Sequence, residues 1–371
     1  MANDQFKYVP QQLFACSVPI SNAKQYYVVD GLLTNGDDLV KNTKPHYEDI
    51  SSIERSFKVH SRMETINVGL PMPDEESSNA VEVVLPAGKV QKELFQIISI
   101  RNNASEIKYD LNVRAEKGSC ATVILCCHTL MDKRCSTVEC INIKVEEGAS
   151  LTLLALQNEN ELAARDTHVS ILLEKGATLN MNNITLHEGC VTNNITAVLG
   201  GEEAECNLNG LYLADGEKVV NTQINILHAV PNCRSNQLFK GILGGNSKSD
   251  FGGEIIVATD AQGTEAYQAN NNLLVSDGAR ALSQPHLVIY ADDVKCSHGS
   301  TIGTVGDEEM FYMRSRGISE AEARVLQQQA FAGTVLEKIS NPELRERLSS
   351  LVERRLRGEF TKCGSCSKHR C

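Results

Sequence analysis

Two side chains of types that can bind iron lie two residues apart in the stretch ADDVKCSHG. They are a thiol at Cys296 and an imidazole at His298. The apolar run 287–290 precedes them, and on a β-strand residues i and i+2 point to the same face. Mixed cysteine and histidine ligation is known for iron–sulfur centres. A cluster normally takes about four protein ligands, so these two would need the remainder from a second chain.

A structural role accounts for the same residues. Cys296 would then fill the core, and His298 would cap a turn before Gly299. The neighbouring carboxylates, Asp292 and Asp293, could bind iron through oxygen, but this residue type also favours turns, and we favour the turn.

The end of the chain, KCGSCSKHRC, brings four further potential ligands close together, at Cys363, Cys366, His369 and Cys371. A Cys-x-x-Cys pair suits zinc or iron, but structural zinc sites usually hold their second pair on a separate ordered segment. We therefore favour a thiol-bearing tail without metal, and keep a weak metal site as the alternative.

A repeat must position the Cys296–His298 pair. VRAEKGSCATVILCC, IKVEEGASLTLLALQ and ILLEKGATLNMNNI share one template, in which a strand, a charged residue, a glycine and a second strand follow one another. The marker glycines recur about every 25 to 30 residues, which is typical of a solenoid. They are Gly88, Gly118, Gly148, Gly176 and Gly201.

Residues on both faces of these strands are apolar or small, which indicates strands that are covered on both sides. We therefore expect a mainly β protein, a parallel β-helix over residues 81–305, after an irregular region at 1–80. Small core positions are a sufficient role for most cysteines of the repeat, namely Cys120, Cys126, Cys140 and Cys206.

Helix signals begin after the repeat. Asp307 is a candidate N-cap of a helix that ends at Gly317, and the sequence SEAE from Ser319 is a capping box for a second helix that would run to about Ile339. Asn341 followed by Pro342 opens a third helix. We expect a helical region at 306–358 and a Cys-rich tail at 359–371.

The segment SDFGGEIIVATDAQGTEAYQANNNLLVSDGARALSQPHLVIYADDVKCSHGSTIG, followed by FYMRSRGIS, resembles the SufB/SufD family of the SUF iron–sulfur cluster assembly system. The CSHG version resembles the SufD type. The resemblance implies a right-handed parallel β-helix and a scaffold subunit rather than an enzyme. It also implies that His298, and secondly Cys296, contact iron or a nascent cluster at a subunit interface.

The partners that the resemblance implies are a SufB-like paralogue, bound through the β-helix, and a SufC-like ABC ATPase, bound through the helical region. The docking residues would be Phe311, Tyr312, Arg314 and Arg316. No phosphate-binding G-x-x-x-x-G-K-[ST] motif occurs, so only the partner would bind ATP. We expect no permanent cofactor, only a transient cluster shared with the partner.

The composition disfavours several classes of partner and location. A net charge of −11 disfavours nucleic acid, no apolar run approaches the length of a membrane span, and the first residues lack a secretory signal. Thirteen cysteines without disulfide-scaffold spacing fit reduced thiols, so we expect a cytoplasmic protein.

Two other functions remain open. One is a self-sufficient homodimeric iron–sulfur or metal carrier, since the chain could also form a homodimer in isolation. The other is a β-helix enzyme acting on polysaccharide with the Asp292–Asp293 or Glu202–Glu203 pair. The absence of Trp disfavours the enzyme, because sugars usually stack on aromatic residues.

Overall fold

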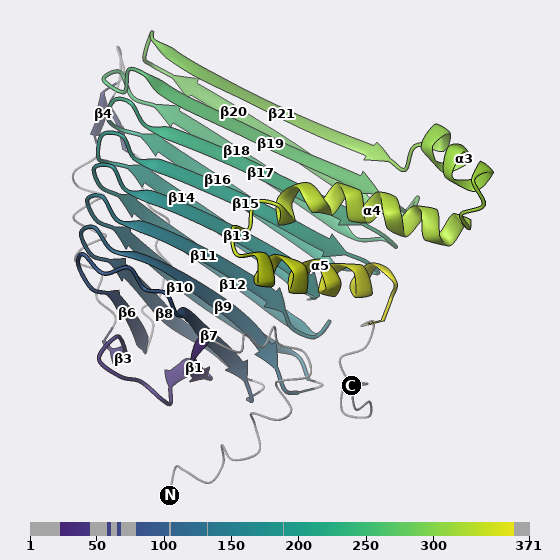
Figure 1. Cartoon of the computed structure of the whole chain (residues 1–371), viewed down its shortest axis with the longest axis horizontal. Coiled ribbons are helices and arrows are strands. Elements are labelled where there is room, and N and C mark those ends of the chain that lie inside the picture. The colour runs from purple at the N-terminus through teal and green to yellow at the C-terminus, as the bar shows by residue number, and fades with distance from the viewer. Residues whose placement is uncertain are drawn as a thin grey trace, which may run out of the picture.

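The computed structural model describes residues 23–44, 79–103, 105–131, 133–187 and 189–359, together with the backbone of 58–60 and 65–67. Within these ranges the chain forms two long sheets and three helices (Figure 1). In the first sheet the strand order is β2 (Leu32–Leu33), β1 (Ala23–Val29), β7 (Leu94–Arg101), β9 (Cys120–Thr129), β11 (Ser150–Asn158), β13 (Thr178–His187), β15 (Glu205–Ala214), β17 (Arg234–Leu243), β19 (Thr264–Leu274), β21 (Val294–Thr304).

In the second sheet the order is β20 (Arg280–Ile289), β18 (Lys248–Val257), β16 (Val219–His228), β14 (Cys190–Leu199), β12 (Ala163–Leu173), β10 (Cys135–Val145), β8 (Glu106–Ala115), β6 (Ala80–Leu85), β3 (Val40–Thr43). A separate antiparallel pair joins β4 (Lys58–His60) and β5 (Thr65–Asn67).

Each coil adds one parallel strand to each sheet, and equivalent residues stack. Ser150, for example, pairs with Cys120 of the preceding coil and with Thr178 of the next one. The result is a parallel β-solenoid of about eight turns, which confirms the expected fold class. An apolar lumen lies between the two sheets.

Glycine allows the turn between the two sheets to repeat. Gly88, Gly118, Gly148 and Gly176 all have φ between 61° and 66°, a left-handed conformation that favours glycine. The next coil differs, because Glu203 takes this conformation with φ 63°. Gly201 instead lies so close to the preceding turn that a Cβ atom would come within 1.9 Å of the Lys175 nitrogen. Gly201 therefore does not extend the marker series.

Helices α4 (Glu320–Leu336) and α5 (Pro342–Leu356) cover the outer face of the first sheet, and α3 (Asp307–Ser315) projects beyond it (Figure 1). On β9, Val123 and Leu125 face the lumen, whereas Ile124 and Cys126 pack in the cluster with α4 and α5. The expectation of strands covered on both faces is confirmed for β9.

The helix boundaries follow local capping. The Ser319 hydroxyl accepts from the Glu322 N–H, and the Asn341 side chain accepts from the Leu344 N–H, as expected. Gly317 has φ 86° after the first helix. Two boundaries differ, since the N-cap of α3 is Gly306 rather than Asp307, and α4 ends at Leu336 rather than near Ile339.

Two further expectations need correction. Residues 1–80 are not irregular throughout, because β1 pairs in parallel with β7 and β3 pairs with β6, so both sheets extend into this region. Cys126, Cys140 and Cys206 are buried, but Cys120 is exposed. Cys120 begins β9, on the same face as Ile124 but beyond the cover of the helices. None of the helices in the described ranges has the length and apolar character that crossing a bilayer requires.

Candidate functional site

The last coil leaves one end of the solenoid open. Strands β20 and β21 are the terminal strands of their sheets, and β21 is exposed along most of its length. Side chains that would be interior in another coil contact solvent here, and Ile289 and Ile302 are 39% and 48% exposed. Unpaired strand edges of this kind are templates for pairing with another chain.

Both candidate iron ligands lie on β21. Cys296 pairs in register with Ala266 of β19, and His298 pairs with Gln268. Ala266 and Gln268 are buried, so the two ligands stand on the lumen side of the sheet. Cys296 is partly buried, and this burial raises the pKa of its thiol, whereas His298 is exposed.

A line of polar side chains leads to His298 along the lumen. Gln237, Gln268 and His298 occupy equivalent positions in three successive strands. The Gln268 side-chain amide donates to the Gln237 side-chain oxygen at 2.5 Å. The imidazole is therefore the solvent-exposed end of a row of interior polar groups, rather than an isolated surface residue.

The described residues contain no group of three or more His, Cys, Asp or Glu side chains placed to hold a metal ion. Among the residues that the structure describes, Cys296 and His298 therefore form an incomplete ligand set. Asp292 and Asp293 lie in the turn before β21, where the Asp293 N–H donates to the Gln262 side chain at 2.9 Å. That geometry supports the turn interpretation of the two carboxylates.

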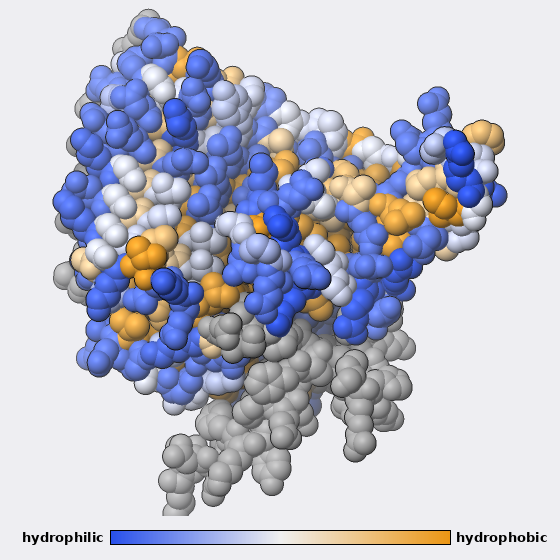
Figure 2. All heavy atoms as spheres, in the orientation of Figure 1, coloured by the Kyte–Doolittle hydropathy of each residue, from blue (hydrophilic) through white to orange (hydrophobic). Residues whose placement is uncertain are grey.

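A second exposed feature lies on α3 and α4. Phe311 and Tyr312 are 75% and 59% exposed, and Leu326 of α4 is exposed beside them. Apolar residues gather on this projecting lobe in Figure 2. The Arg316 guanidinium lies 5.2 Å from the centre of the Tyr312 ring, and Arg314 is 3.6 Å from Glu320. Phe311 therefore does not pack onto the last coil.

The comparison with protein families agrees with this geometry. A family model described as SUF system FeS cluster assembly, SufBD core domain, matches residues 99–331. The chain belongs to the SufBD family. The match begins in β7 and ends in α4, so it includes the open end with Cys296 and His298.

This chain matches only part of the length of each relative. The chain is 34% identical over 256 residues to the iron–sulfur cluster assembly protein SufD of Escherichia coli, which is 69% of this chain and 60% of that protein. It is 34% identical over 238 residues to a SufBD family protein of Mycobacterium leprae, 61% of this chain and 60% of the relative. A SufBD family protein of Synechocystis is 32% identical over 210 residues, 57% and 46% of the two chains.

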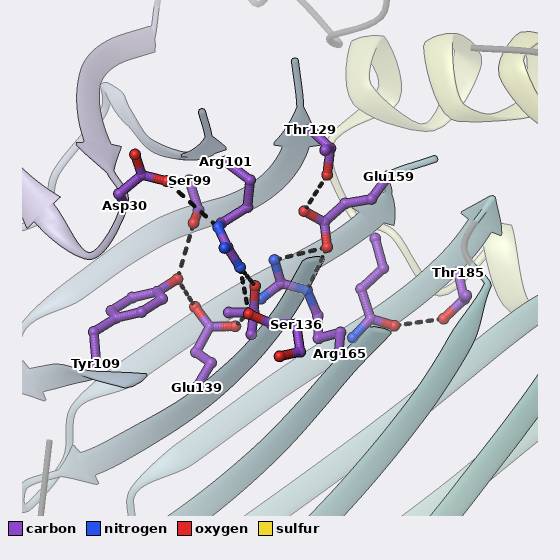
Figure 3. Close-up of polar contacts among 12 residues, drawn as sticks. Asp30, Ser99, Arg101, Tyr109, Thr129, Ser136, Glu139, Glu159, Arg165 and Thr185 are labelled. Carbon is purple, nitrogen blue, oxygen red and sulfur yellow. Dashed lines mark hydrogen bonds and ion pairs between the residues drawn. The ribbon is translucent and has the colours of Figure 1, made fainter. Parts of the chain in front are cut away.

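A group of charged residues inside this SufBD-family chain, between β7 and β12, was not predicted from the sequence (Figure 3). Arg165 forms ion pairs of 2.9 Å with both Glu139 and Glu159, and all three side chains are almost completely buried. Tyr109 donates to Glu139, and burial, together with the Glu139 charge, raises the pKa of Tyr109 well above its usual value. Arg101 donates to the Ser136 carbonyl oxygen in the same group.

Two histidines of the solenoid strands, His187 and His228, are buried and hydrogen-bonded. His187 Nδ1 lies 2.6 Å from the Glu159 carbonyl oxygen, and His228 Nε2 lies 2.9 Å from the Ser235 hydroxyl. Burial lowers the pKa of each to about 4. The remaining candidate ligands, Cys363, Cys366, His369 and Cys371, lie outside the described residues.

Proposed function

We propose that this SufBD-family chain is a scaffold subunit for iron–sulfur cluster assembly. In this proposal its open end pairs with a SufB-like chain, and the nascent cluster is built where the two chains meet. The observation that carries the proposal is an uncovered terminal coil that presents two iron-binding side chains but not a complete ligand set.

The chemistry of the two ligands fits a cluster that is cargo rather than a resident cofactor. The exposed His298 can receive iron without prior unfolding of the coil. Two ligands from this chain hold a cluster only in part, so the cluster can be passed on once the other chain releases it. Cys296 is less accessible, and its raised pKa means that a bound metal must displace the thiol proton. We therefore assign the first contact to His298 and a supporting contact to Cys296.

The test is cluster formation in the assembled complex. The chain is co-expressed with SufB-like and SufC-like partners, purified without oxygen, and assayed for iron, sulfide and visible absorbance. His298→Ala should lower cluster content at least about tenfold, because loss even of an indirect metal contact typically costs that much. Ser297→Ala, on the opposite face of β21, is the matched control. Normal cluster content with His298→Ala would refute the assigned role.

The projecting lobe supports a second part of the proposal, which is docking of a SufC-like ATPase. Aromatic and arginine side chains are frequent interface anchors, and Phe311, Tyr312, Arg314 and Arg316 meet that description on α3. Phe311→Ser should weaken binding of the ATPase about tenfold or more, whereas Glu346→Ser, an exposed change on α5, should not. Isothermal titration calorimetry with the isolated ATPase measures both.

The same open end favours one alternative, a homodimeric carrier, because an unpaired edge can also accept a second copy of the chain. Anaerobic reconstitution of the isolated protein with iron and sulfide separates the two functions. A stable, stoichiometric cluster without partners would favour the carrier. ATP binding by the partner alone and a cytoplasmic location stay predictions of the scaffold model.

A further inference from the structure

Gln268, the neighbour of His298 in the polar row of the lumen, carries a hydrogen-bond acceptor that is not in use. Its side chain is 3% exposed, and its amide nitrogen donates to Gln237 Oε1 at 2.5 Å. Gln268 Oε1 is buried and has no hydrogen-bond partner among the described residues. Leaving a buried acceptor without a partner is costly. An unused acceptor directly beside a candidate iron ligand therefore needs a physical reason.

Two neighbours hold the Gln268 amide in place. Gln237, on β17, is itself 2% exposed and accepts from the amide nitrogen. Gly253, on β18, leaves the space that the amide fills, because a Cβ atom there would lie 2.3 Å from Gln268 Nε2. The nitrogen and the oxygen of an amide are on separate branches of one plane, so the bond to Gln237 leaves the oxygen for another neighbour. The direction of the acceptor is thus set without any contribution from His298.

His298 is the neighbour of Gln268 on the next strand, β21. The two residues pair in register, so their side chains stand on the same face, about 4.8 Å apart along the sheet. Both side chains line one groove of about 640 Å³, which gives the imidazole room to turn toward the amide. In the second sheet Pro285 pairs with Gly253, and a proline side chain has no hydrogen-bonding group. This residue therefore offers the imidazole no alternative partner.

We propose that Gln268 is a positioning residue for His298, whose imidazole donates its Nδ1–H to Gln268 Oε1. Nδ1 is the ring nitrogen nearer the main chain, so Nε2 extends toward the open edge with its lone pair available for iron. Metal-binding histidines usually donate their other ring N–H to an oxygen acceptor, which fixes both the tautomer and the ring orientation. The purpose assigned to this hydrogen bond rests on the proposed scaffold function, but the bond itself can be tested without a cluster.

The tautomer of His298 is the direct test, and imidazole nitrogen chemical shifts report it. The full chain is labelled with ¹⁵N-histidine and measured at about pH 8.5, where an ordinary imidazole is neutral. His298→Ala identifies the His298 signals by their loss. Most His298 rings of the unaltered protein should carry their proton on Nδ1. Gln268→Met, which keeps the size of the side chain but removes the acceptor, should lower the ratio of Nδ1-protonated to Nε2-protonated rings about fivefold, the effect of a typical net hydrogen bond.

Two further variants separate positioning from a general effect on the lumen. Gln268→Glu keeps an acceptor oxygen and should retain the Nδ1-protonated form. Gln157→Met is the matched control, because it makes the same replacement at a buried glutamine of β11, four strands away in the sheet, and it should leave the His298 tautomer unchanged. In the assembled complex, Gln268→Met should lower cluster content about tenfold, and Gln157→Met should not lower it.

Two results would overturn this inference. One is a His298 ring that is protonated mainly on Nε2 in the unaltered protein, a measurement that stands even where a substitution at Gln268 impairs folding. The other is an equal tautomer ratio in the unaltered and Gln268→Met proteins. Either result leaves the scaffold function in place if His298→Ala still lowers cluster content. Normal cluster content with His298→Ala refutes the iron contact instead, and the tautomer then decides the hydrogen bond alone.

Discussion

The inner coils and the last coil of the solenoid have the same strand pattern but treat polar groups in opposite ways. On β12, in the middle of the second sheet, the lumen encloses Arg165, and this guanidinium pairs with Glu139 and Glu159. In the last coil His298 also stands on the lumen side, but it is exposed, because no further strand among the described residues covers β21. The inner coils enclose paired charges of one chain, and the open end leaves its side chains and backbone edges unpaired within the described residues.

This difference separates folding stability from partner binding. Buried charges are tolerated only when each has a partner, so the inner coils depend on every member of this network. An exposed edge contributes little to folding of its own chain, and it can contribute to an interface instead. Substitutions in the inner coils and at the open end should therefore change different measurements.

The largest effect is expected in the inner coils. Arg165→Leu leaves Glu139 and Glu159 buried without their cation, and should lower the free energy of unfolding by about 3–5 kcal/mol. Urea denaturation followed by circular dichroism measures the loss. Arg234→Leu is the control, because this arginine is 64% exposed and its ion pair with Glu265 is 3.7 Å long. Arg234→Leu should lower the free energy of unfolding by less than about 1 kcal/mol. Equal losses in the two variants would contradict the expected difference between buried and exposed charges.

The buried His228 should make stability depend on pH. Its pKa of about 4 in the folded protein is below the unfolded value near 6.5, so the unfolded chain binds a proton that the folded chain does not. Its contribution is present above pH 6.5 and is lost as the pH falls toward 4. At pH 5 the loss should be about 2 kcal/mol. Urea denaturation at pH 7 and pH 5 tests this, and His228→Gln should reduce the difference by that amount.

An intermediate effect is expected on partner binding at the open end. Ile302→Asp places a charge on an exposed apolar residue of β21, and should weaken pairing with a SufB-like chain about tenfold, or about 1.4 kcal/mol. Val90→Asp makes the same change at an exposed apolar residue near the other end. Calorimetric titration with the partner should show no loss for Val90→Asp, and equal weakening would place the interface elsewhere.

The smallest effect is expected from His298→Ala on the stability of the isolated protein. Because the imidazole is exposed, the free energy of unfolding should change by no more than about 0.5 kcal/mol. The same substitution should abolish most cluster formation in the complex. A loss of several kcal/mol in the free energy of unfolding would mean that His298 stabilises the coil. It would also remove the distinction between the inner coils and the open end.

Local patterns predicted much of the fold. The glycine repeat and the apolar residues on both strand faces predicted the coils, and the caps at Ser319 and Asn341 predicted two helix starts. These signals depend on residues within a few positions of one another. The first 80 residues were predicted less well, because β1 and β3 join sheets whose other strands lie further along the chain.

The site was predicted only in part. Cys296 and His298 were identifiable because two ligand types on one strand face are visible within three residues. The pairing of Arg165 with Glu139 was not identifiable from the sequence. The two residues lie 26 positions apart and meet only through the register of β10 and β12. The groove lined by Arg134, Cys190, Lys218 and Arg355 is likewise assembled from segments that are far apart in the sequence.

The sequence by itself determined the repeating coil, the two covered strand faces and the residue types of the candidate iron-binding pair. The tertiary structure decided which charges are enclosed, which coil is left uncovered and which cations share a groove. The physical reason is the distance in sequence over which each effect acts. Strand alternation and helix capping act between residues that are near neighbours in the sequence. Burial and electrostatic environment, in contrast, depend on what the stacked coils and the helices place beside each side chain.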